Sequence, residues 1–476
     1  MKRRLLTLAC TICLLFSLPF TLASCYRLDT TTTAEDGIVS ASINEDGELI
    51  VLYRDGTQQS LGVVVGKDGK NGTNGIDGKD GKDGENGTNG ADGKDGKDGK
   101  DGVNGADGAD GKDGSLVITG GESSIPTAIA KAIRSTVSIV CKFEGTASQG
   151  GSRPSTQTYS SSGSGVIYEM NKDQGNAFII TNFHVVYDAS SNTQNGVSDD
   201  ICVYLYGSEA DSQAIEATFV GGSLYYDIAV LSIEGSEILK ASDACSVTTA
   251  NSDAVSVGES AIAIGNAKSY GLSASSGIIS VDSEYIDMLG ADGTTQISPR
   301  VLRVDTAINA GNSGGGLFDG NGNLLGIVNA KIVDTSVENI GYAIPSNVAV
   351  AVAENILDYC YGTTNERVQR ALLGVTVISS DSHAVYNATT GRTTIEETVS
   401  IYEISSGALA DGVLQVGDVL VSVTINDQAV SITRQHHIID RMLDARVGDT
   451  VLFNLLRDGV EESVSITITA ECLTAY

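Results

Sequence analysis

Glycine occupies every third position of this 476-residue chain from Gly66 to Gly114, without a break. Each triplet ends in Asp or Asn, and half of the triplets have Lys after the glycine. This strict period allows three extended chains to wind around one crowded axis, where only glycine fits. The repeat contains no proline, and it therefore lacks the fixed φ that reduces the entropy cost of such a helix. Lys–Asp pairs between chains and trimerisation of neighbouring domains would have to stabilise it.

Two structures remain open for this collagen-like repeat. A triple helix of about 48 residues, at about 3.1 Å each, would span about 150 Å. A flexible, well-solvated tether of the same length would average only about 40 Å. The calcium-binding nonapeptide repeat fits poorly, because its period is nine and includes a large apolar residue.

The N-terminal segment has the order of an export signal. A positive start, Lys2 to Arg4, precedes a mostly apolar stretch from Leu5 to Phe20 and then Leu22-Ala23-Ser24-Cys25. The last four residues resemble a bacterial lipobox, so residues 1–24 are interpreted as a lipoprotein-type signal and Cys25 as the lipidated residue. Ordinary secretion and a retained membrane anchor are the alternatives. All of them put the rest of the chain outside the cytoplasm.

Between this signal and the repeat, residues 25–65 are expected to form a spacer and a small β unit. Ile38 to Gly66 predicts short strands with turns at Asp46-Gly47 and Asp55-Gly56. Alone, this unit is too short to bury much core.

Charge and cysteine usage exclude several classes of function. The net charge of −30 argues against a nucleic-acid partner, because a phosphate backbone requires a basic surface. Of the eight cysteines, Cys10 and Cys13 lie in the signal and Cys25 would be lipidated, which leaves an odd number without CxxC spacing. This pattern indicates neither a disulfide framework nor a zinc site. Cys141 and Cys202 are expected to be buried in strands. With no P-loop or zinc signature, the sequence predicts no cofactor and no metal.

Residues 129–345 are rich in short Val, Ile and Tyr runs separated by Gly, Asn and Asp. This pattern predicts a β-barrel or sandwich, with a helix only near Ile125 to Ile133. Three residues in this region form a chemical set: His184 in TNFHVV, Asp227 in YDIAVL and Ser313 in GNSGGG. Taken singly, each has an ordinary structural explanation as a satisfied histidine, a strand-edge carboxylate or a glycine-rich turn.

Together, these residues fit nucleophilic catalysis. A serine hydroxyl is a weak nucleophile and needs an adjacent base, which His184 supplies near neutral pH. Asp227 would hold the imidazole in the right tautomer and stabilise the imidazolium. The surrounding glycines free backbone amides to bind an oxyanion, and the expected donors are the N–H groups of Gly311 and Ser313.

Chain order separates two folds that could carry this chemistry. The segment around Ser313 also satisfies G-x-S-x-G, the nucleophile elbow of α/β-hydrolases. That fold has the order Ser, acid, His, and it places a helix after the serine. Here His184 comes first, and another strand-like run follows Ser313. The order His, Asp, Ser favours the chymotrypsin-like double β-barrel.

Seven segments of this region share their residues and their order with one known family: Gly163–Ile167, Thr181–Val186, Asp227–Ile233, Val257–Asn266, Ser276–Ser280, Asp305–Gly315 and Gly341–Asn347. Through them, residues 129–470 resemble the HtrA family of trypsin-like serine proteases with an appended PDZ domain. The resemblance implies a mainly β fold, with a protease domain at 125–358 and a PDZ domain at 366–472. It also implies trimers and the catalytic roles of His184, Asp227 and Ser313.

Two residues of the protease domain depart from the family pattern. Gly316 stands where proline usually follows G-N-S-G-G, which loosens the loop but keeps the serine chemistry. Lys331 falls in a segment that helps to line the family's primary specificity pocket. Its side chain is expected to point to solvent, and the alternative is a changed preference for small aliphatic residues.

The C-terminal part resembles a PDZ domain. Asn347 to Asp358 predicts a connecting helix with one apolar face. Leu372, Leu373, Gly374 and Val375 resemble the loop that binds a peptide carboxylate, so C-terminal peptides are expected to add a strand there. The alternative is a packing module that positions the protease.

Two further segments of the C-terminal part were compared with PDZ domains. Asp411-Gly412-Val413 stands where PDZ domains of this family commonly have the sequence Ala-Gly-Leu, and thus departs from their pattern. His436-His437 lies near the start of a helix expected at Arg434 to Leu443, and neither a metal nor a catalytic role is expected for it.

These features predict an extracytoplasmic serine endopeptidase that is anchored to the membrane by the N-terminal lipid. It would cleave unfolded or extended proteins, or one specific exported partner. The alternative is a surface binding protein or chaperone that uses the PDZ and collagen-like regions and carries a latent protease head.

Overall fold

The structure is a computed structural model, and it describes residues 38–43, 48–53, 57–63, 124–147, 155–208, 213–330 and 340–476. Its contacts divide the chain into two units, Met1–Asp110 and Gly111–Tyr476. The export signal, Cys25, the glycine repeat and Lys331 lie outside the described residues, so the predictions for them stay predictions. Within the described ranges, no helix has the length and apolar character needed to cross a membrane.

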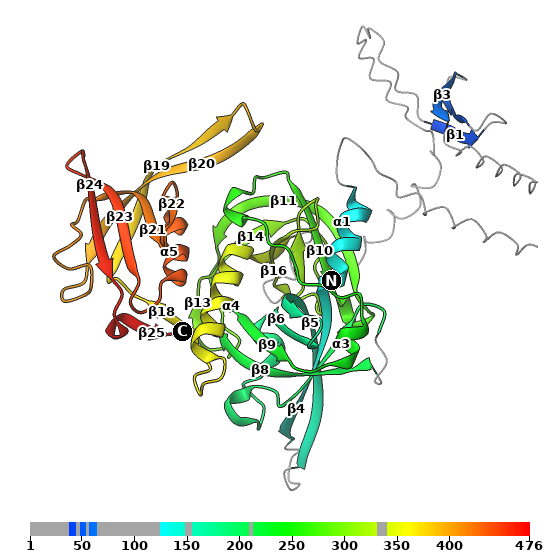
Figure 1. Ribbon diagram of the computed structural model, residues 1–476, viewed down its shortest axis with the longest axis horizontal. Coiled ribbons are helices and arrows are strands. Elements are labelled where there is room, and N and C mark those ends of the chain that lie inside the picture. The colour runs from blue at the N-terminus through cyan, green and yellow to red at the C-terminus, as the bar shows by residue number, and fades with distance from the viewer. Residues whose placement is uncertain are drawn as a thin grey trace, which may run out of the picture. The chain divides into compact units, whose positions relative to one another are not determined.

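The first unit contains a small antiparallel sheet (Figure 1). Strands β1 (Ile38–Ile43), β2 (Glu48–Tyr53) and β3 (Gln58–Val63) follow one another in chain order, with Ser42 opposite Ile50 and Val51 opposite Gln59. The strands predicted before the repeat are therefore present.

Two closed six-stranded barrels form the body of the second unit, which confirms the double β-barrel. The first barrel has the order β4-β5-β6-β9-β8-β7 and the second β10-β11-β14-β17-β16-β15. The first comprises β4 (Thr136–Ala147), β5 (Ser155–Asn171), β6 (Asn176–Thr181), β7 (Asp200–Leu205), β8 (Ile215–Ser223) and β9 (Ile228–Ile233). The second comprises β10 (Ser260–Gly265), β11 (Ser273–Tyr285), β14 (Arg300–Val304), β15 (Gly316–Phe318), β16 (Leu324–Val328) and β17 (Gly341–Pro345). A short hairpin of β12 (Met288–Leu289) and β13 (Gln296–Ile297) lies between β11 and β14.

Continuous apolar runs in the sequence become strands that are buried on both faces. In β9, Ala229 and Leu231 face the core of the first barrel, whereas Ile228 and Val230 belong to the core shared by both barrels. In β10, alanines and isoleucines divide in the same way between the core of the second barrel and this shared core. Because side chains alternate along a strand, each run supplies two cores at once. The shared core thereby packs the two barrels together.

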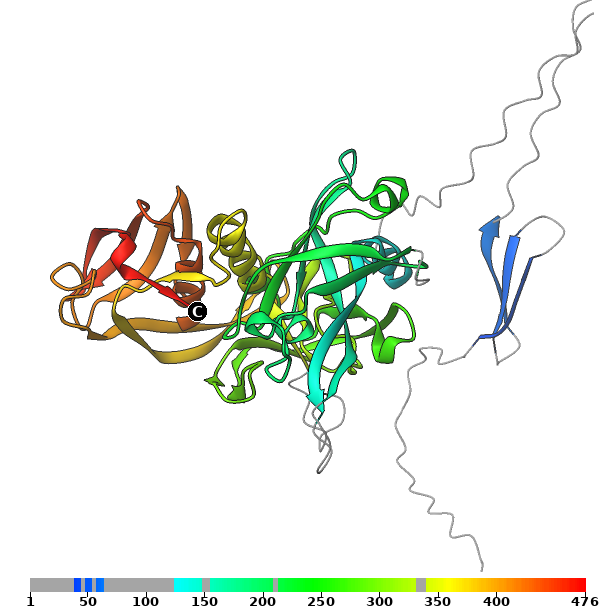
Figure 2. The same ribbon diagram turned by 90° about the horizontal axis from the view of Figure 1, so that it is seen from below.

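Helices border the barrels. Helix α1 (Ile125–Ala132) lies where a helix was expected, and α4 (Ser346–Cys360) confirms and extends the helix predicted at 347–358. Helix α4 buries Val348, Val352 and Ile356 in the shared core and lies between the barrels and the C-terminal domain (Figure 2). The expectation of no other helix in this region was wrong, because α2 (Phe183–Val186) and α3 (Glu237–Ala241) are also helical. Helices of four and five residues are too short to show an amphipathic period.

The C-terminal domain consists of antiparallel strands of different lengths and helix α5 (Gln435–Arg441). A separate pair joins β18 to β25, and the main sheet has the order β19-β20-β21-β23-β24, with β22 beside β21. The strands are β18 (Gln369–Ala371), β19 (Val375–Asn387), β20 (Arg392–Ile404), β21 (Val419–Ile425), β22 (Gln428–Ser431), β23 (Thr450–Arg457), β24 (Val460–Thr467) and β25 (Leu473–Ala475). The domain has a hydrophobic core of its own that includes Val423, Phe453 and Ile438.

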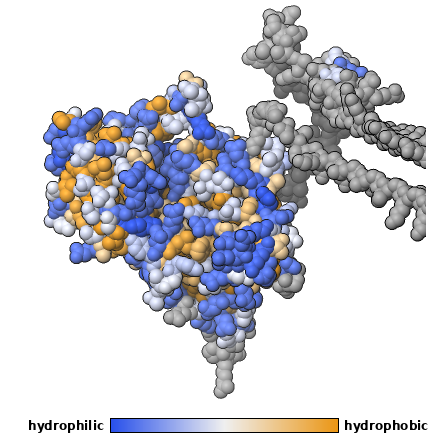
Figure 3. Space-filling model, in the orientation of Figure 1, coloured by the Kyte–Doolittle hydropathy of each residue, from blue (hydrophilic) through white to orange (hydrophobic). Residues whose placement is uncertain are grey.

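Polar contacts join this domain to the second barrel. The side chain of Arg300 in β14 is 2% exposed and lies 2.8 Å from both Asp253 and Asp440, and Asp440 belongs to α5. At the end of the long β19–β20 hairpin, Arg392 donates to the carbonyl oxygen of Ala254 at 3.0 Å and pairs with Glu259 at 3.0 Å. Elsewhere, one face of the molecule is mostly hydrophilic with scattered apolar patches, as the acidic composition suggests (Figure 3).

Asp440→Asn is expected to change how stability depends on pH. Burial raises the pKa of Asp440 to about 6, although Arg300 beside it acts in the opposite direction. Between pH 4 and 6 the folded chain therefore holds a proton that the unfolded chain has released, and the wild type loses stability as pH rises through this window. Asparagine cannot ionise, so the variant does not lose stability in this way. Its free energy of unfolding, relative to that of the wild type, should therefore rise by about 3 kcal/mol between pH 4 and pH 7.

Urea unfolding of both proteins at several pH values measures this difference. Asp292→Asn is the control: burial acts to raise the pKa of Asp292, but hydrogen bonds from Thr295 and Thr294 outweigh it and lower the pKa. That titration falls below pH 4, so the control difference should stay flat between pH 4.5 and 7. A flat difference for Asp440→Asn would contradict the prediction.

Candidate active site

His184 and Asp227 meet at the ends of two neighbouring strands of the first barrel. The apolar sequence around His184 resembled a strand, but His184 lies in helix α2, just after β6. Asp227 directly precedes β9 and is buried, with a left-handed φ of 51°. Its Oδ2 lies 2.6 Å from His184 Nδ1, and its Oδ1 accepts from the backbone N–H of His184 at 2.9 Å. A carboxylate can only accept, so Nδ1 carries the proton and Nε2 is left as a base.

Two asparagines that the sequence analysis did not single out also hold Asp227. Asn329 Nδ2 donates to Asp227 Oδ2 at 2.8 Å, and Asn182 Nδ2 donates to the backbone oxygen of Asp227 at 2.9 Å. Both asparagines are buried. Asn182 was quoted only as part of the TNFHVV motif, and no local signal marked Asn329. These two bonds hold the side chain and the backbone of Asp227 in addition to its bonds with His184.

Ser313 is held beside the same group of residues. It is buried and lies in the loop before β15, and its hydroxyl accepts from the backbone N–H of Ala330 at 3.2 Å. Ala330 follows Asn329, which binds Asp227, so two successive residues connect the serine to the aspartate. Among the described residues, no hydrogen bond joins Ser313 Oγ to His184. Hydrogen bonds between a catalytic serine and its base often form or tighten only when substrate is bound.

The loop before Ser313 exposes two backbone donors. Gly311 has a φ of +96°, and a Cβ there would lie 2.2 Å from the carbonyl oxygen of Asn266, so only glycine fits. Lys268 N–H donates to the carbonyl oxygen of Ala310 at 2.8 Å. This bond fixes the peptide group that carries the N–H of Gly311. Within the described part of the chain, neither the N–H of Gly311 nor that of Ser313 has an acceptor. Two free amides on one short loop are what binding an oxyanion requires.

Comparison with known proteins agrees with this arrangement. The model of the trypsin-like peptidase domain matches residues 163–327, which include His184, Asp227 and Ser313. Serine protease Do-like HtrA of Lactococcus lactis subsp. cremoris (strain MG1363) is 30% identical over 319 residues, covering 65% of this chain and 71% of that protein. The chain belongs to the HtrA family of serine proteases.

Other HtrA relatives match over similar lengths. Serine protease Do-like HtrA of Bacillus subtilis (strain 168) is 32% identical over 321 residues, covering 66% of this chain and 65% of that protein. The chain thus spans just under two thirds of the Bacillus relative. The periplasmic pH-dependent serine endoprotease DegQ of Escherichia coli (strain K12) is 29% identical, with 72% of this chain and 70% of that protein covered.

Two further comparisons concern the structure and the N-terminal part. A solved structure of the HtrA-type protease AlgW with decapeptide is 24% identical and covers 73% of this chain and 98% of that chain, with a TM-score of 0.45. The model of the collagen triple helix repeat matches residues 64–121. The collagen-like character of the repeat is therefore shown.

Gly316, which replaces the usual HtrA proline, has a packing reason. It begins β15, and a Cβ at this position would lie 2.3 Å from the ring of Phe318. Phe318 is fully buried in the core shared by the barrels. The glycine therefore makes room for a large core side chain.

The loop expected to bind a peptide carboxylate precedes β19. Gly374 has a φ of +76°, and a Cβ there would lie 2.2 Å from the Cβ of Ala408. Leu373 is buried, whereas Leu372 is exposed. In the described part of the chain, the N–H groups of Leu373 and Gly374 have no acceptor, although the N–H of Leu372 donates to Cys472 O at 3.0 Å. This loop, which continues into Val375, thus offers two donors to a carboxylate.

One cluster has a metal-like composition but does not fit a cation. Asp253, His436 and His437 offer ligand atoms within 4.8 Å of one another, a set that zinc could use. However, Asp253 already lies 2.8 Å from the buried guanidinium of Arg300. Burial, Arg300, His437 and Arg434 lower the pKa of His436. The guanidinium groups of Arg300 and Arg434 put positive charge beside the cluster, which disfavours a metal ion there, so we assign no metal to it.

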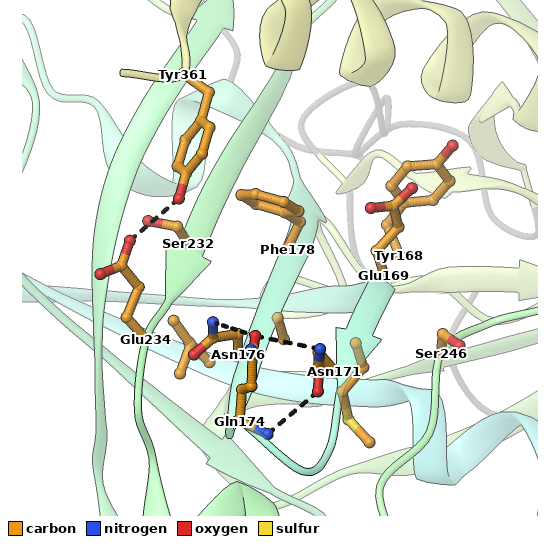
Figure 4. A pocket seen from close by; sticks show the side chains of 13 residues that line it. Tyr168, Glu169, Asn171, Gln174, Asn176, Phe178, Ser232, Glu234, Ser246 and Tyr361 are labelled. Carbon is orange, nitrogen blue, oxygen red and sulfur yellow. Dashed lines mark hydrogen bonds between the residues drawn. The ribbon is translucent and has the colours of Figure 1, made fainter.

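The cavity in Figure 4 is separate from the candidate active site. It measures about 530 Å³ and lies over the β5–β6 hairpin, the end of β9 and Tyr361, which follows α4. Tyr361 donates to Glu234 at 3.2 Å, while the amides of Asn171 and Asn176 bond Gln174. None of His184, Asp227 and Ser313 lines it. The amide bonds to Gln174 hold the β5–β6 turn, whereas the Tyr361–Glu234 bond joins the segment after α4 to the end of β9.

Proposed function

We propose that this protein is an extracytoplasmic serine endopeptidase, with Ser313 as nucleophile, His184 as general base and Asp227 as the residue that orients it. The observation that carries the proposal is the connected set of contacts from His184 through Asp227 and Asn329–Ala330 to Ser313. The free amides of Gly311 and Ser313 support it as the oxyanion donors.

The geometry suits acyl transfer in two halves. Ser313 Oγ would bond to the scissile carbonyl carbon while its proton passes to Nε2 of His184, and the amides of Gly311 and Ser313 would bind the resulting oxyanion. Collapse would break the C–N bond, and the leaving amine would take the proton from His184. Water, deprotonated by His184, would then hydrolyse the ester and release Ser313.

The substrates we propose are unfolded or extended proteins, because the cleavage site must reach a nucleophile in a barrel loop. C-terminal peptides would bind the Leu372–Val375 loop by adding a strand beside β19. We further propose lipidation of Cys25, export across the membrane and assembly into trimers. A trimer is favoured because a collagen-like helix also needs three chains.

Covalent labelling tests the proposal. The full-length chain in detergent is treated with a fluorophosphonate, with and without unfolded casein, and the tagged peptide is located by mass spectrometry. We expect the tag on Ser313 and degradation of casein. A folded protein with no tag on Ser313 under either condition, and with casein intact, would overturn the proposal in favour of a binding protein on a protease fold.

A further inference from the structure

Ser164 in β5 is fully buried and makes four hydrogen bonds around the nucleophile loop. Its hydroxyl donates to the carbonyl oxygen of Gly311 at 2.8 Å and accepts from the N–H of Asn266 at 2.8 Å. Its own N–H donates to the carbonyl oxygen of Ser313 at 2.8 Å. Its carbonyl oxygen accepts from Thr181 Oγ1 at 2.7 Å. One residue thus contacts the loop on both sides of Asn312.

These contacts fix the peptide groups next to the proposed oxyanion donors. The Ser164 hydroxyl holds the peptide that joins Gly311 to Asn312, and the Ser164 N–H holds the one that follows Ser313. The donor N–H of Ser313 lies between these two groups. The donor N–H of Gly311 lies on the other side, in the peptide that Lys268 holds through Ala310. Because the Ser164 hydroxyl also binds Asn266, it joins the nucleophile loop to the loop that carries Lys268.

The chain leaves space for this hydroxyl. A Cβ on Gly265 would lie 3.0 Å from Ser164 Oγ and 2.9 Å from Asn312 Cα. The absence of that atom lets β5, the end of β10 and the nucleophile loop approach closely. The Ser164 hydroxyl fills the gap with one donor and one acceptor interaction, which a hydroxyl can supply together and an alanine cannot.

We propose that the side chain of Ser164 is a positioning residue for catalysis. It touches no substrate and acts through Gly311, by holding the loop so that both oxyanion donors point at one place. This inference rests on the proposed protease function. Removing one direct oxyanion donor typically lowers kcat by about 10²- to 10³-fold. Loosening the support should cost less, so we expect Ser164→Ala to lower kcat by about 10- to 100-fold with KM nearly unchanged.

The test uses Ser164→Ala in the full chain, with Ser138→Ala as a matched control. Ser138 is the cross-strand partner of Ser164 on β4, is also buried, and its hydroxyl has no partner within the described residues. Peptide hydrolysis gives kcat and KM, and thermal unfolding shows that each variant is folded. Amide hydrogen exchange over residues 305–316 reports the loop itself, independently of activity.

We expect Ser164→Ala to lower kcat, to weaken binding of a peptide boronate in parallel, and to raise exchange in residues 305–316. Ser138→Ala should change none of these, and Ser164→Thr should recover part of kcat because it keeps a hydroxyl. A kcat within twofold of wild type, a change confined to KM, or an equal loss in Ser138→Ala would overturn the proposal. If the wild type itself is not labelled at Ser313, the proposed protease function is wrong. In that case hydrogen exchange still tests the inference: unchanged exchange in Ser164→Ala would show that Ser164 does not hold the loop in place.

Discussion

Replacing Ser313 with alanine is expected to remove fluorophosphonate labelling and to lower kcat by about 10⁴- to 10⁶-fold. The hydroxyl is the only group of this residue that can form the acyl bond. The residual activity of the variant should come from oxyanion binding and substrate positioning, because the backbone amides at positions 311 and 313 are kept. Casein degradation and peptide hydrolysis, measured at equal concentrations of folded protein, give the ratio.

The cost in stability should be small. Ser313 Oγ accepts one hydrogen bond, from Ala330 N–H, and losing a single bond of this kind costs about 1 kcal/mol. Ser256→Ala removes another buried hydroxyl, one that has no partner among the described residues, and should keep full activity. Proteolysis in Ser313→Ala at more than a hundredth of the wild-type rate would show that another residue is the nucleophile.

The barrels could be predicted because their signal is local. Short apolar runs separated by turn residues indicated strands, and the order of the three motifs chose a double barrel over an α/β-hydrolase. The run containing His184 was misleading, since its apolar residues continue past the end of β6 into α2. A four-residue helix has no period to read. There the chain turns so that the N–H groups of Phe183 and His184 both donate to Asp227.

The residues that position the catalytic groups could not be predicted in the same way. Asn329 lies 102 residues from Asp227 in the sequence, and Ser164 lies 147 residues from Gly311. Such contacts arise only when the barrels close and pack together. The same holds for Arg300 and Asp440, which meet across two domains. Motifs identify residues that carry chemistry, whereas the residues that position them depend on three-dimensional neighbours.

Asp227→Asn should lower kcat by about 10⁴-fold while leaving the fold intact. Asparagine tolerates the left-handed φ of 51° at this position, so the backbone should not change. One side-chain oxygen is replaced by an NH₂ group. If the remaining oxygen faces the backbone N–H of His184, the NH₂ group faces Nδ1 and selects the tautomer with the proton on Nε2. That tautomer cannot accept a proton from Ser313.

Asn329→Ala is the matched control, because it removes one donor to Asp227 and keeps the carboxylate. The hydrogen bond from His184 Nδ1 then still sets the tautomer, so the loss in kcat should be only about 10- to 100-fold, in line with one hydrogen bond to a charged group of about 1.5 to 3 kcal/mol. Both variants should keep KM near the wild-type value, since neither side chain binds substrate. If Asp227→Asn loses less activity than Asn329→Ala, Asp227 does not orient His184, and its bonds to α2 serve only the fold.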